Sequence, residues 1–155
     1  MKIIILMTAV FLTMAFGRPA SAADKLVLFN GFYTVVETSQ LVGDKVIIDG
    51  NGHGNSSLGK FQITYHDEID TMTGKGEGSS QLTFHNGDIF SAGTVETNDI
   101  TGVDAINVVT KLHFQTSGTG RFASGLGDFA AEHMVDIATG ETFASFKGEF
   151  LKTTP

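Results

Sequence analysis

The stretch that decides the fold is residues 116–150, TSGTGRFASGLGDFAAEHMVDIATGETFASFKGEF. From Phe129 to Asp136, Phe, Ala, His and Val at odd positions alternate with Ala, Glu, Met and Asp at even positions. Further on, Phe143 alternates with Ala144, and then Phe146, Gly148 and Phe150 share one face opposite Ser145, Lys147 and Glu149. A period of two is typical of a half-buried strand, and Gly140 between the two runs can supply the positive φ of a turn. This stretch therefore predicts a β-hairpin.

Similar alternation recurs through the rest of the chain. Strands are expected at residues 27–39, 58–69, 81–85, 88–97 and 106–116. Another strand begins at Val46 and is expected to end in the glycine-rich run 49–55. Turns are expected at 42–44 and 71–74, and at Asn86-Gly87, where both central residues accept a positive φ. A loop is expected at 98–104. With the terminal hairpin, the chain then has eight strands.

No apolar pattern with a period near 3.6 persists for the length that a helix needs. Many short strands joined by turns in a glycine-rich chain predict an all-β fold, an eight-stranded antiparallel up-and-down β-barrel. Closure also removes sheet edges, which this sequence does little to protect with proline or lysine. A two-sheet sandwich is the structural alternative.

The first 22 residues have the pattern of a secretory signal peptide. Lys2 precedes an apolar run from Ile3 to Phe16, and Ala20-Ser21-Ala22 fits a cleavage site. A membrane anchor would need about 20 apolar residues, and the run is shorter than that. We expect cleavage after Ala22, a single domain over residues 23–155, no membrane span in the mature chain, and a periplasmic or extracellular location.

The composition restricts the class of partner. The net charge of −7 becomes more negative once Lys2 and Arg18 leave with the signal peptide, and an acidic surface repels phosphate backbones, so nucleic acid is not expected to bind. The chain has no cysteine, so stability has to come from packing and sheet hydrogen bonds.

A weak internal repeat supports a barrel made of two halves. Leu58-Gly59-Lys60-Phe61 and Leu126-Gly127-Asp128-Phe129 each lead into a strand and then an Asp-x-x-Thr-Gly turn. The two motifs are two residues further apart in the first copy than in the second, and because this difference is even, inward and outward faces keep their parity. In this alignment Phe61 matches Phe129, and Tyr65 matches His133.

Two glycine-rich segments carry a family resemblance. Residues 118–125, GTGRFASG, and residues 52–61, GHGNSSLGKF, resemble the signatures of secreted bacterial proteins whose barrels are like those of allene oxide cyclases and plant dirigent proteins, a calycin-like fold. Ser57 stands where the second signature tends to carry histidine, so no role of that histidine transfers. The resemblance implies a barrel and leaves the activity open.

The histidines and the glycine-rich run do not form a metal signature. His53, His66, His85, His113 and His133 lie on different expected elements without ligand spacing, and we expect neither a metal nor a cofactor. His66, His85 and His113 lie opposite the apolar faces of their strands, which predicts solvated side chains. The run 49–55 looks like a calcium loop but lacks the closing glutamate, so glycines that let a strand bend are the better interpretation.

Four polar side chains share the apolar faces of their strands: Glu37, Tyr65, Glu96 and His133. If these faces line a lumen, the four are candidate catalytic residues that could orient a ligand or move a proton. The alternative is that the tyrosine and histidine are satisfied core residues and that the glutamates lie in water at the barrel ends.

Three functions fit these patterns. The first is a non-catalytic barrel that binds a small apolar or amphipathic molecule or acts as a scaffold; the second is an isomerase or cyclase resembling allene oxide cyclase; the third is a structural or partner-binding module that forms homo-oligomers through its outer faces. The residues expected to line a ligand pocket are Phe61, Ile63, Tyr65, Phe84, Phe114, Phe129, His133 and Phe146. A cavity of about 300 Å³ or more would favour a ligand, and a lumen sealed by phenylalanines would favour the structural role.

Overall fold

The computed structural model describes residues 25–98 and 106–152. The expected signal peptide, its cleavage point and most of the loop expected at 98–104 lie outside the described residues. The strands are β1 (Lys25–Val42), β2 (Lys45–Ser56), β3 (Gly59–Asp70), β4 (Lys75–Phe84), β5 (Ile89–Asn98), β6 (Ile106–Gly118), β7 (Gly127–Asp136) and β8 (Glu141–Lys152), with a short 3₁₀ helix, η1 (Gly120–Phe122), between β6 and β7.

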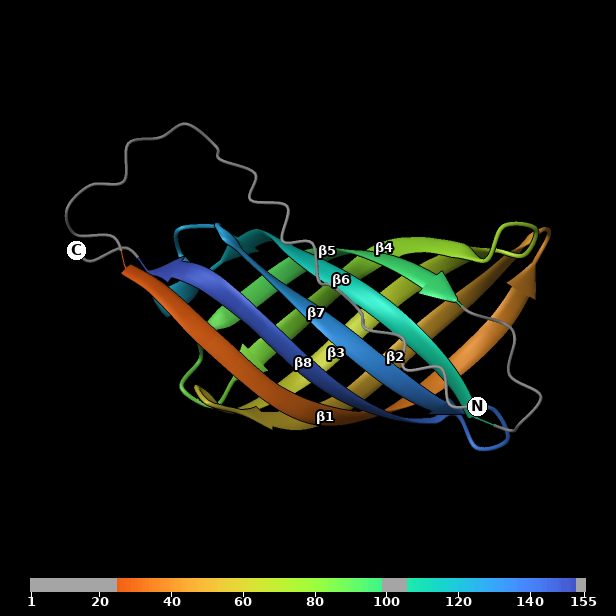
Figure 1. The fold of residues 1–155 in the computed structure, drawn as a ribbon, viewed down its shortest axis with the longest axis horizontal. Coiled ribbons are helices and arrows are strands. Elements are labelled where there is room, and N and C mark those ends of the chain that lie inside the picture. Colours follow the sequence, from red (N-terminus) through yellow and green to blue (C-terminus); the bar gives the residue numbers. More distant parts are fainter. Residues whose placement is uncertain (1–24, 99–105, 153–155) are drawn as a thin grey trace, which may run out of the picture.

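The strands form one closed barrel in sequence order, and every neighbouring pair is antiparallel (Figure 1). The barrel closes where β1 pairs with β8, with Tyr33 opposite Ala144. The predicted all-β fold, an eight-stranded antiparallel up-and-down β-barrel, is confirmed, and the sandwich alternative is wrong. Closure gives each strand a partner on both sides, so the sheet has no free edge.

The turns fall where the sequence places them, with one difference in type. Gly43, Gly87 and Gly140 have φ values of 65°, 87° and 72°. Among the described residues no side-chain-bearing residue has a positive φ, Asn86 included. The Asn86-Gly87 turn is therefore not the type in which both central residues adopt positive φ, because the connection from β4 to β5 is longer than two residues.

Strand β2 does not dissolve in its glycine-rich run but continues through it to Ser56. Gly50, Gly52 and Gly54 face inward, under side chains of the neighbouring strands. A Cβ on Gly50 would lie 2.2 Å from Cζ of Tyr65, and one on Gly54 would lie 2.4 Å from Cζ of Phe61. These glycines make room for large rings inside a narrow barrel, so the run is a strand and not a loop.

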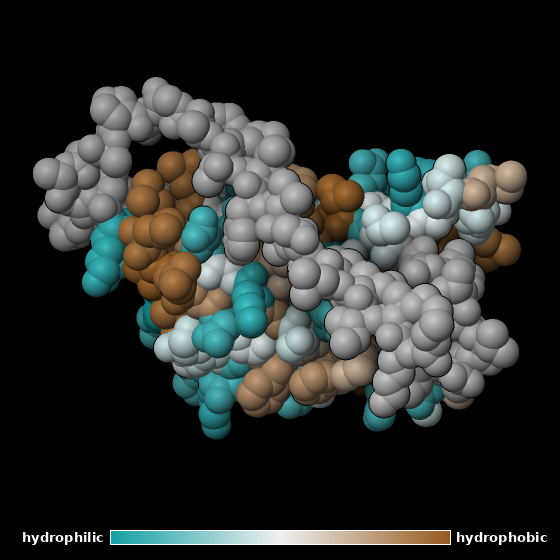
Figure 2. Space-filling view, viewed as in Figure 1, coloured by the Kyte–Doolittle hydropathy of each residue, from teal (hydrophilic) through white to brown (hydrophobic). Residues whose placement is uncertain are grey.

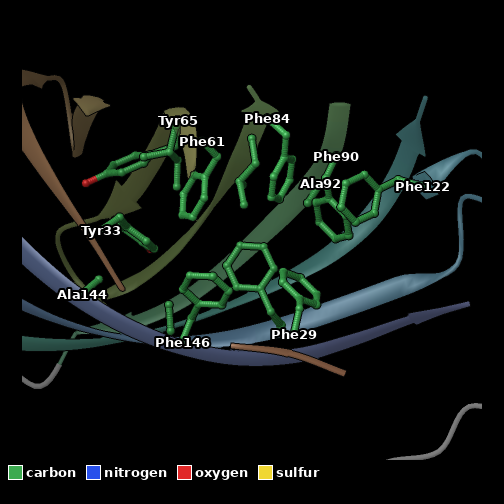
Figure 3. Packing of buried hydrophobic residues seen from close by; sticks show 14 of the residues in the cluster. Phe29, Tyr33, Phe61, Tyr65, Phe84, Phe90, Ala92, Phe122, Ala144 and Phe146 are labelled. Carbon is green, nitrogen blue, oxygen red and sulfur yellow. The ribbon is translucent and has the colours of Figure 1, made fainter. Parts of the chain in front are cut away.

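Eight phenylalanines fill one half of the interior, here called the aromatic half: Phe29, Phe61, Phe84, Phe90, Phe122, Phe129, Phe146 and Phe150, all buried. The ring of Phe29 contacts five of the others at centroid distances of 5.5–6.4 Å. Figure 3 shows these rings pointing toward one another across the barrel, with Phe122 at one end of the group and Tyr33 and Tyr65 at the other. The aromatic half is a packed core.

Helix η1 closes the barrel at the aromatic end. The glycine-rich turn after β6 folds back so that Phe122 is completely buried, 4.6 Å from the ring of Phe150. The turn is held by Arg121, whose Nε lies 2.5 Å from Oδ2 of Asp88, while its Nη1 donates to the carbonyl oxygen of Leu58. A Cβ at Gly120, whose φ is 56°, would collide with Asp88. This turn therefore closes the aromatic end of the lumen.

The orientation predicted for two neighbouring residues on β6 is wrong. Phe114 lies on the outer wall and is 43% exposed, and His113 is completely buried. The inward row of β6 is Val109, Lys111 and His113, whereas the outward row is the more apolar one. Hydrophobicity therefore gives the wrong face for this strand, because its inward side carries polar groups that find partners inside.

The outer wall has two different sides. Strands β2, β3 and β4 present mostly polar side chains, whereas β1 and β5–β8 expose many apolar ones. Figure 2 shows apolar side chains gathered near the start of β1, where Leu26 and Leu28 are exposed. In the described ranges, no helix is long and apolar enough to cross a membrane.

Candidate functional site: the charged half of the lumen

Polar side chains occupy the other half of the interior, here called the charged half: Tyr33, Glu37, Tyr65, Asp67, Thr94, Glu96, Lys111, His133 and Thr142. They come from β1, β3, β5, β6, β7 and β8, each at an inward position of its strand. This half lies at the end of the barrel where β1 turns into β2 and β7 turns into β8 (Figure 1, right). All four candidate residues predicted from the sequence are brought together here.

Lys111 is the centre of this half. Its Nζ lies 2.6 Å from Oδ2 of Asp67 and 3.1 Å from Oε2 of Glu96. The same ammonium stands over the ring of Tyr65, 4.0 Å from its centroid, as in a cation–π contact. Burial by itself lowers the pKa of Lys111, but the negative charges of Asp67, Glu96 and Glu37 outweigh it and raise the pKa. Lys111 is therefore a buried cation.

Asp67 and Glu96 are accommodated by glycines on the strand between them. Oδ1 of Asp67 accepts from the hydroxyl of Thr94. A Cβ on Gly78 would lie 2.3 Å from Oδ1 of Asp67, and one on Gly76 would lie 2.5 Å from Cγ of Glu96. Strand β4 thus leaves inward space that the two carboxylates fill.

Two tyrosines connect the remaining groups. The hydroxyl of Tyr65 donates to Oε1 of Glu37. The hydroxyl of Tyr33 lies 2.6 Å from Nε2 of His133. Burial, followed by the charge of Glu37, raises the pKa of Tyr65, so this phenol stays neutral. Burial, followed by the charge of Lys111, lowers the pKa of His133 well below its ordinary value, so this imidazole is neutral too.

His113 marks the boundary between the two halves. Its ring stacks on Phe129 at a centroid distance of 4.0 Å, and its Nδ1 lies 2.8 Å from Oγ of Ser80. Burial, followed by the charge of Lys111, lowers the pKa of His113 to about 3. The prediction that this histidine is solvated is therefore wrong, whereas His66 and His85 are exposed as expected.

Not every polar atom in the interior is satisfied. Nδ1 of His133, Nε2 of His113 and Oγ1 of Thr142 are buried without a hydrogen-bond partner. A buried polar atom without a partner is destabilising, by about 1–3 kcal/mol, and each such atom in a native structure calls for an explanation such as a bound water or ion.

A cavity of about 70 Å³ opens in the charged half. It is lined by Glu37, Ile48, Glu96, Val109, Lys111, His133 and Val135. Three of the four candidate residues line it, and the fourth, Tyr65, binds the Glu37 carboxylate. Glu37, Ile48 and Val135 are half-buried and form its outer edge. The cavity is well below the roughly 300 Å³ typical of small-molecule sites, which by the criterion of the sequence analysis favours the structural role. The cavity has room for only part of a molecule.

The residues predicted to line a ligand pocket have a different place. Phe61, Ile63, Phe84, Phe129 and Phe146 are buried in the core cluster, and Phe114 is outside the barrel. Of the eight, only His133 lines the cavity. The apolar lumen is filled by its own side chains.

A larger hollow of about 440 Å³ lies on the outer wall of β2–β6. Most of its lining is outward-facing and polar, and includes Asp49, Thr64, His66, Gln81 and Thr116. It contains none of the buried charges, so the smaller interior cavity is the better candidate site. No group of three or more His, Cys, Asp or Glu side chains suited to a metal occurs among the described residues.

Sequence reasoning missed Asp67, Lys111 and Phe122. Asp67 lies two residues after Tyr65 and Lys111 two residues before His113, so strand parity places each pair on one face. The glycines opposite Asp67 and Glu96 are a further signal in the sequence. Phe122 lies in a turn without periodicity, and no pattern indicates that it is buried.

Comparison of the chain with models of protein families, with curated proteins and with solved structures gives no match. The likeness to allene oxide cyclase and dirigent barrels stays a prediction from the two glycine-rich signatures.

Proposed function

We propose that this protein is an exported, non-catalytic barrel that binds the polar head of a small amphipathic molecule in the charged half of its lumen. The observation that carries the proposal is the cavity itself. Its walls combine apolar side chains, Ile48, Val109 and Val135, with ionisable ones, Glu37, Glu96, Lys111 and His133. Sites for small molecules likewise combine apolar walls with a few placed polar groups, although here four of the seven lining residues are ionisable.

The size of the cavity and the packing of the aromatic half specify the mode of binding. A water molecule has a share of about 30 Å³ in the liquid, so 70 Å³ takes a head group and not a whole molecule. The apolar part of the bound ligand would extend out of the cavity past its outer edge, which is formed by Glu37, Ile48 and Val135. The aromatic half serves as the rigid support of the site.

Export is part of the proposal and depends on the pattern of the first 22 residues. A basic start, an apolar run and Ala20-Ser21-Ala22 support a signal peptide. The barrel needs no disulfide, since the chain has no cysteine, and packing alone supports it outside the cytoplasm.

Native mass spectrometry of the protein purified from its own host tests the proposal. We expect a bound small molecule that is released on unfolding. Val135→Phe fills the cavity from its edge and should remove the adduct. Met134→Phe, on the outward face of the same strand, should retain it. An adduct that survives Val135→Phe, or a protein without any adduct, would contradict the proposal.

A catalytic role is the alternative, as an isomerase or cyclase. It is favoured by the pairing of Tyr65 with Glu37 beside a neutral His133, because such groups can transfer protons. Incubation of the released molecule with the protein would show turnover. For this alternative, Glu37→Gln should abolish turnover with an unchanged near-UV circular dichroism spectrum; unchanged turnover would remove Glu37 from the mechanism.

Self-association is the second alternative. The side of the barrel formed by β1 and β5–β8 carries exposed apolar groups, and the rings of Phe32 and Phe143 stack at 6.3 Å on it. Sedimentation velocity over a concentration series would test this. A second copy bound on this side should be lost in Phe143→Lys, whereas Thr64→Lys on the polar side should have no effect.

A further inference from the structure

The interior of the charged half contains more acids than bases. Three carboxyl groups, those of Glu37, Asp67 and Glu96, surround one ammonium group, that of Lys111. The two nearby histidines add no positive charge, since the pKa of each is lowered. Among the described residues of the charged half, Lys111 is the one cationic side chain.

The carboxylates of Asp67 and Glu96 are buried and that of Glu37 is half-buried, and this excess of negative charge is unfavourable without a counter-ion. An ionised carboxylate removed from water needs a paired charge or a proton. Asp67 is the closest partner of Lys111, at 2.6 Å, and Glu96 is the next, at 3.1 Å. Glu37 interacts with a neutral group, the hydroxyl of Tyr65. The carboxylate at the edge of the cavity is therefore the one that Lys111 compensates least.

The free volume lies beside two acidic residues and one basic residue. The cavity is bordered by Glu37 and Glu96 as well as by Lys111, so the two acids outnumber the one base around it. His133, completely buried, also borders it, and its Nδ1 has no hydrogen-bond partner. In the tautomer in which Nε2–H donates to the hydroxyl oxygen of Tyr33, Nδ1 is the unprotonated nitrogen and accepts a hydrogen bond from a bound donor. This unpartnered atom is an observation independent of the charge count.

We propose that the cavity binds the ammonium group of an organic amine, which donates to Glu37, Glu96 and Nδ1 of His133. The carbon atoms attached to the nitrogen contact Ile48, Val109 and Val135. This inference rests on the proposed binding function and specifies its ligand class as cationic. Lys111 completes the site by fixing Asp67 and Glu96 in place.

A matched series of three probes tests the ligand class: propylamine, 1-propanol and propionate, at equal ionic strength and neutral pH. The first is a cation, the second is neutral and the third is an anion of similar size. Each is titrated into the isotope-labelled protein, and the imidazole nitrogen signals of His133 are followed by NMR. We expect propylamine to shift these signals in a saturable way and the other two probes to have little effect.

Three variants locate the binding. Glu37→Gln should weaken the binding of propylamine at least tenfold. Val135→Phe should abolish it by filling the cavity without a change of charge, which keeps the test valid if Glu37→Gln is poorly folded. Glu132→Gln, on the outward face next to His133, removes an equal charge and should leave the affinity unchanged.

The possible failures are distinguishable. Saturable binding of 1-propanol or propionate with affinity equal to or above that of propylamine would overturn the cationic ligand and leave the proposed function standing. Absence of a His133 shift with all three probes would overturn both. Propylamine binding that persists in Glu37→Gln and Val135→Phe would place the amine elsewhere and overturn the inference.

Discussion

The two halves of the lumen are formed by the same eight strands, but their buried side chains make different kinds of interaction. In the aromatic half each ring finds its contacts in other rings, as Phe29 does with five neighbours. In the charged half Lys111 relies on Asp67 and Glu96, and a buried nitrogen of His133 has no partner. Packing is complete at one end and incomplete at the other, so under the proposed function the rigid support and the binding site are separated along the barrel axis.

The difference also concerns how each half responds to change. Apolar contacts are non-directional and tolerate small shifts, whereas a partly satisfied polar network depends on every member. We therefore expect substitutions in the aromatic half to reduce stability only. Substitutions in the charged half should change stability together with pH dependence and binding.

Phe29→Ala should have the largest effect on stability. The substitution removes a ring at the centre of the aromatic half and leaves a cavity, so we expect the free energy of unfolding to fall by about 3–5 kcal/mol. Urea denaturation followed by circular dichroism measures it. Phe32→Ala, on the outer wall of the same strand, should have an effect below about 1 kcal/mol. Similar losses in the two variants would show that the aromatic half is not the main core.

Lys111→Met should rank next, with a loss of about 3 kcal/mol, because Asp67 and Glu96 then lose their cation in a buried site. The loss should shrink at low pH, where the two carboxyl groups take up protons. Lys147→Met, at an exposed position of β8, is the control. If the double variant Asp67→Leu/Lys111→Met is no more stable than Lys111→Met, the uncompensated carboxylate is not the cause of the loss.

Gly50→Ala should destabilise the charged half without changing any member of its ion pairs. We expect the free energy of unfolding to fall by about 1–3 kcal/mol through overpacking. The new methyl group would overlap the ring of Tyr65 and displace its hydroxyl from Glu37. Asn51→Ala, the next residue on the same strand, points outward and is the control. Thermal unfolding of both variants gives the comparison. Equal melting temperatures would mean that β2 can move away from β3.

The alternation of side chains predicted most of this architecture, since a closed barrel makes strand parity decide what lies inside. Parity placed Glu37, Tyr65, Glu96 and His133 inside, and register then brought them together at one end. The residues paired by the internal repeat, Phe61 with Phe129 and Tyr65 with His133, also all point inward.

Several buried polar residues of the lumen were not predicted from the alternation of side chains. His113 is predicted to be solvated although it points inward, and Asp67 and Lys111 are not among the predicted interior residues. Asp67 and Lys111 are stable inside only because each is present for the other, and this pairing joins strands β3 and β6, which are not neighbours in the sheet. The orientations of His113 and Phe114 are exchanged relative to the prediction. Strand parity can place Asp67, Lys111 and His113 inside, but one sequence contains no signal of which residues pair across the lumen.

The titration of His113 gives the smallest predicted effect and tests the boundary between the halves. Its pKa is about 3 in the folded protein and 6.5 in its ordinary state, so below pH 6.5 the unfolded chain binds a proton that the native chain does not. Its contribution to stability is therefore complete above pH 6.5 and is lost as the pH falls from 6.5 towards 3. Between pH 7.5 and 5.5 we expect a loss of roughly 1 kcal/mol from this group.

His113→Gln keeps a polar side chain near Ser80 and removes the titration, so the unfolding free energy of this variant should depend less on pH over the same interval. Urea titrations at the two pH values measure the difference, in which the common effects of the carboxylates and of His133 cancel. His85→Gln, at an exposed position, should behave like the parent protein. If the parent and His113→Gln lose equal stability, His113 is protonated in the folded protein, and the stack on Phe129 holds an imidazolium at the border of the charged half.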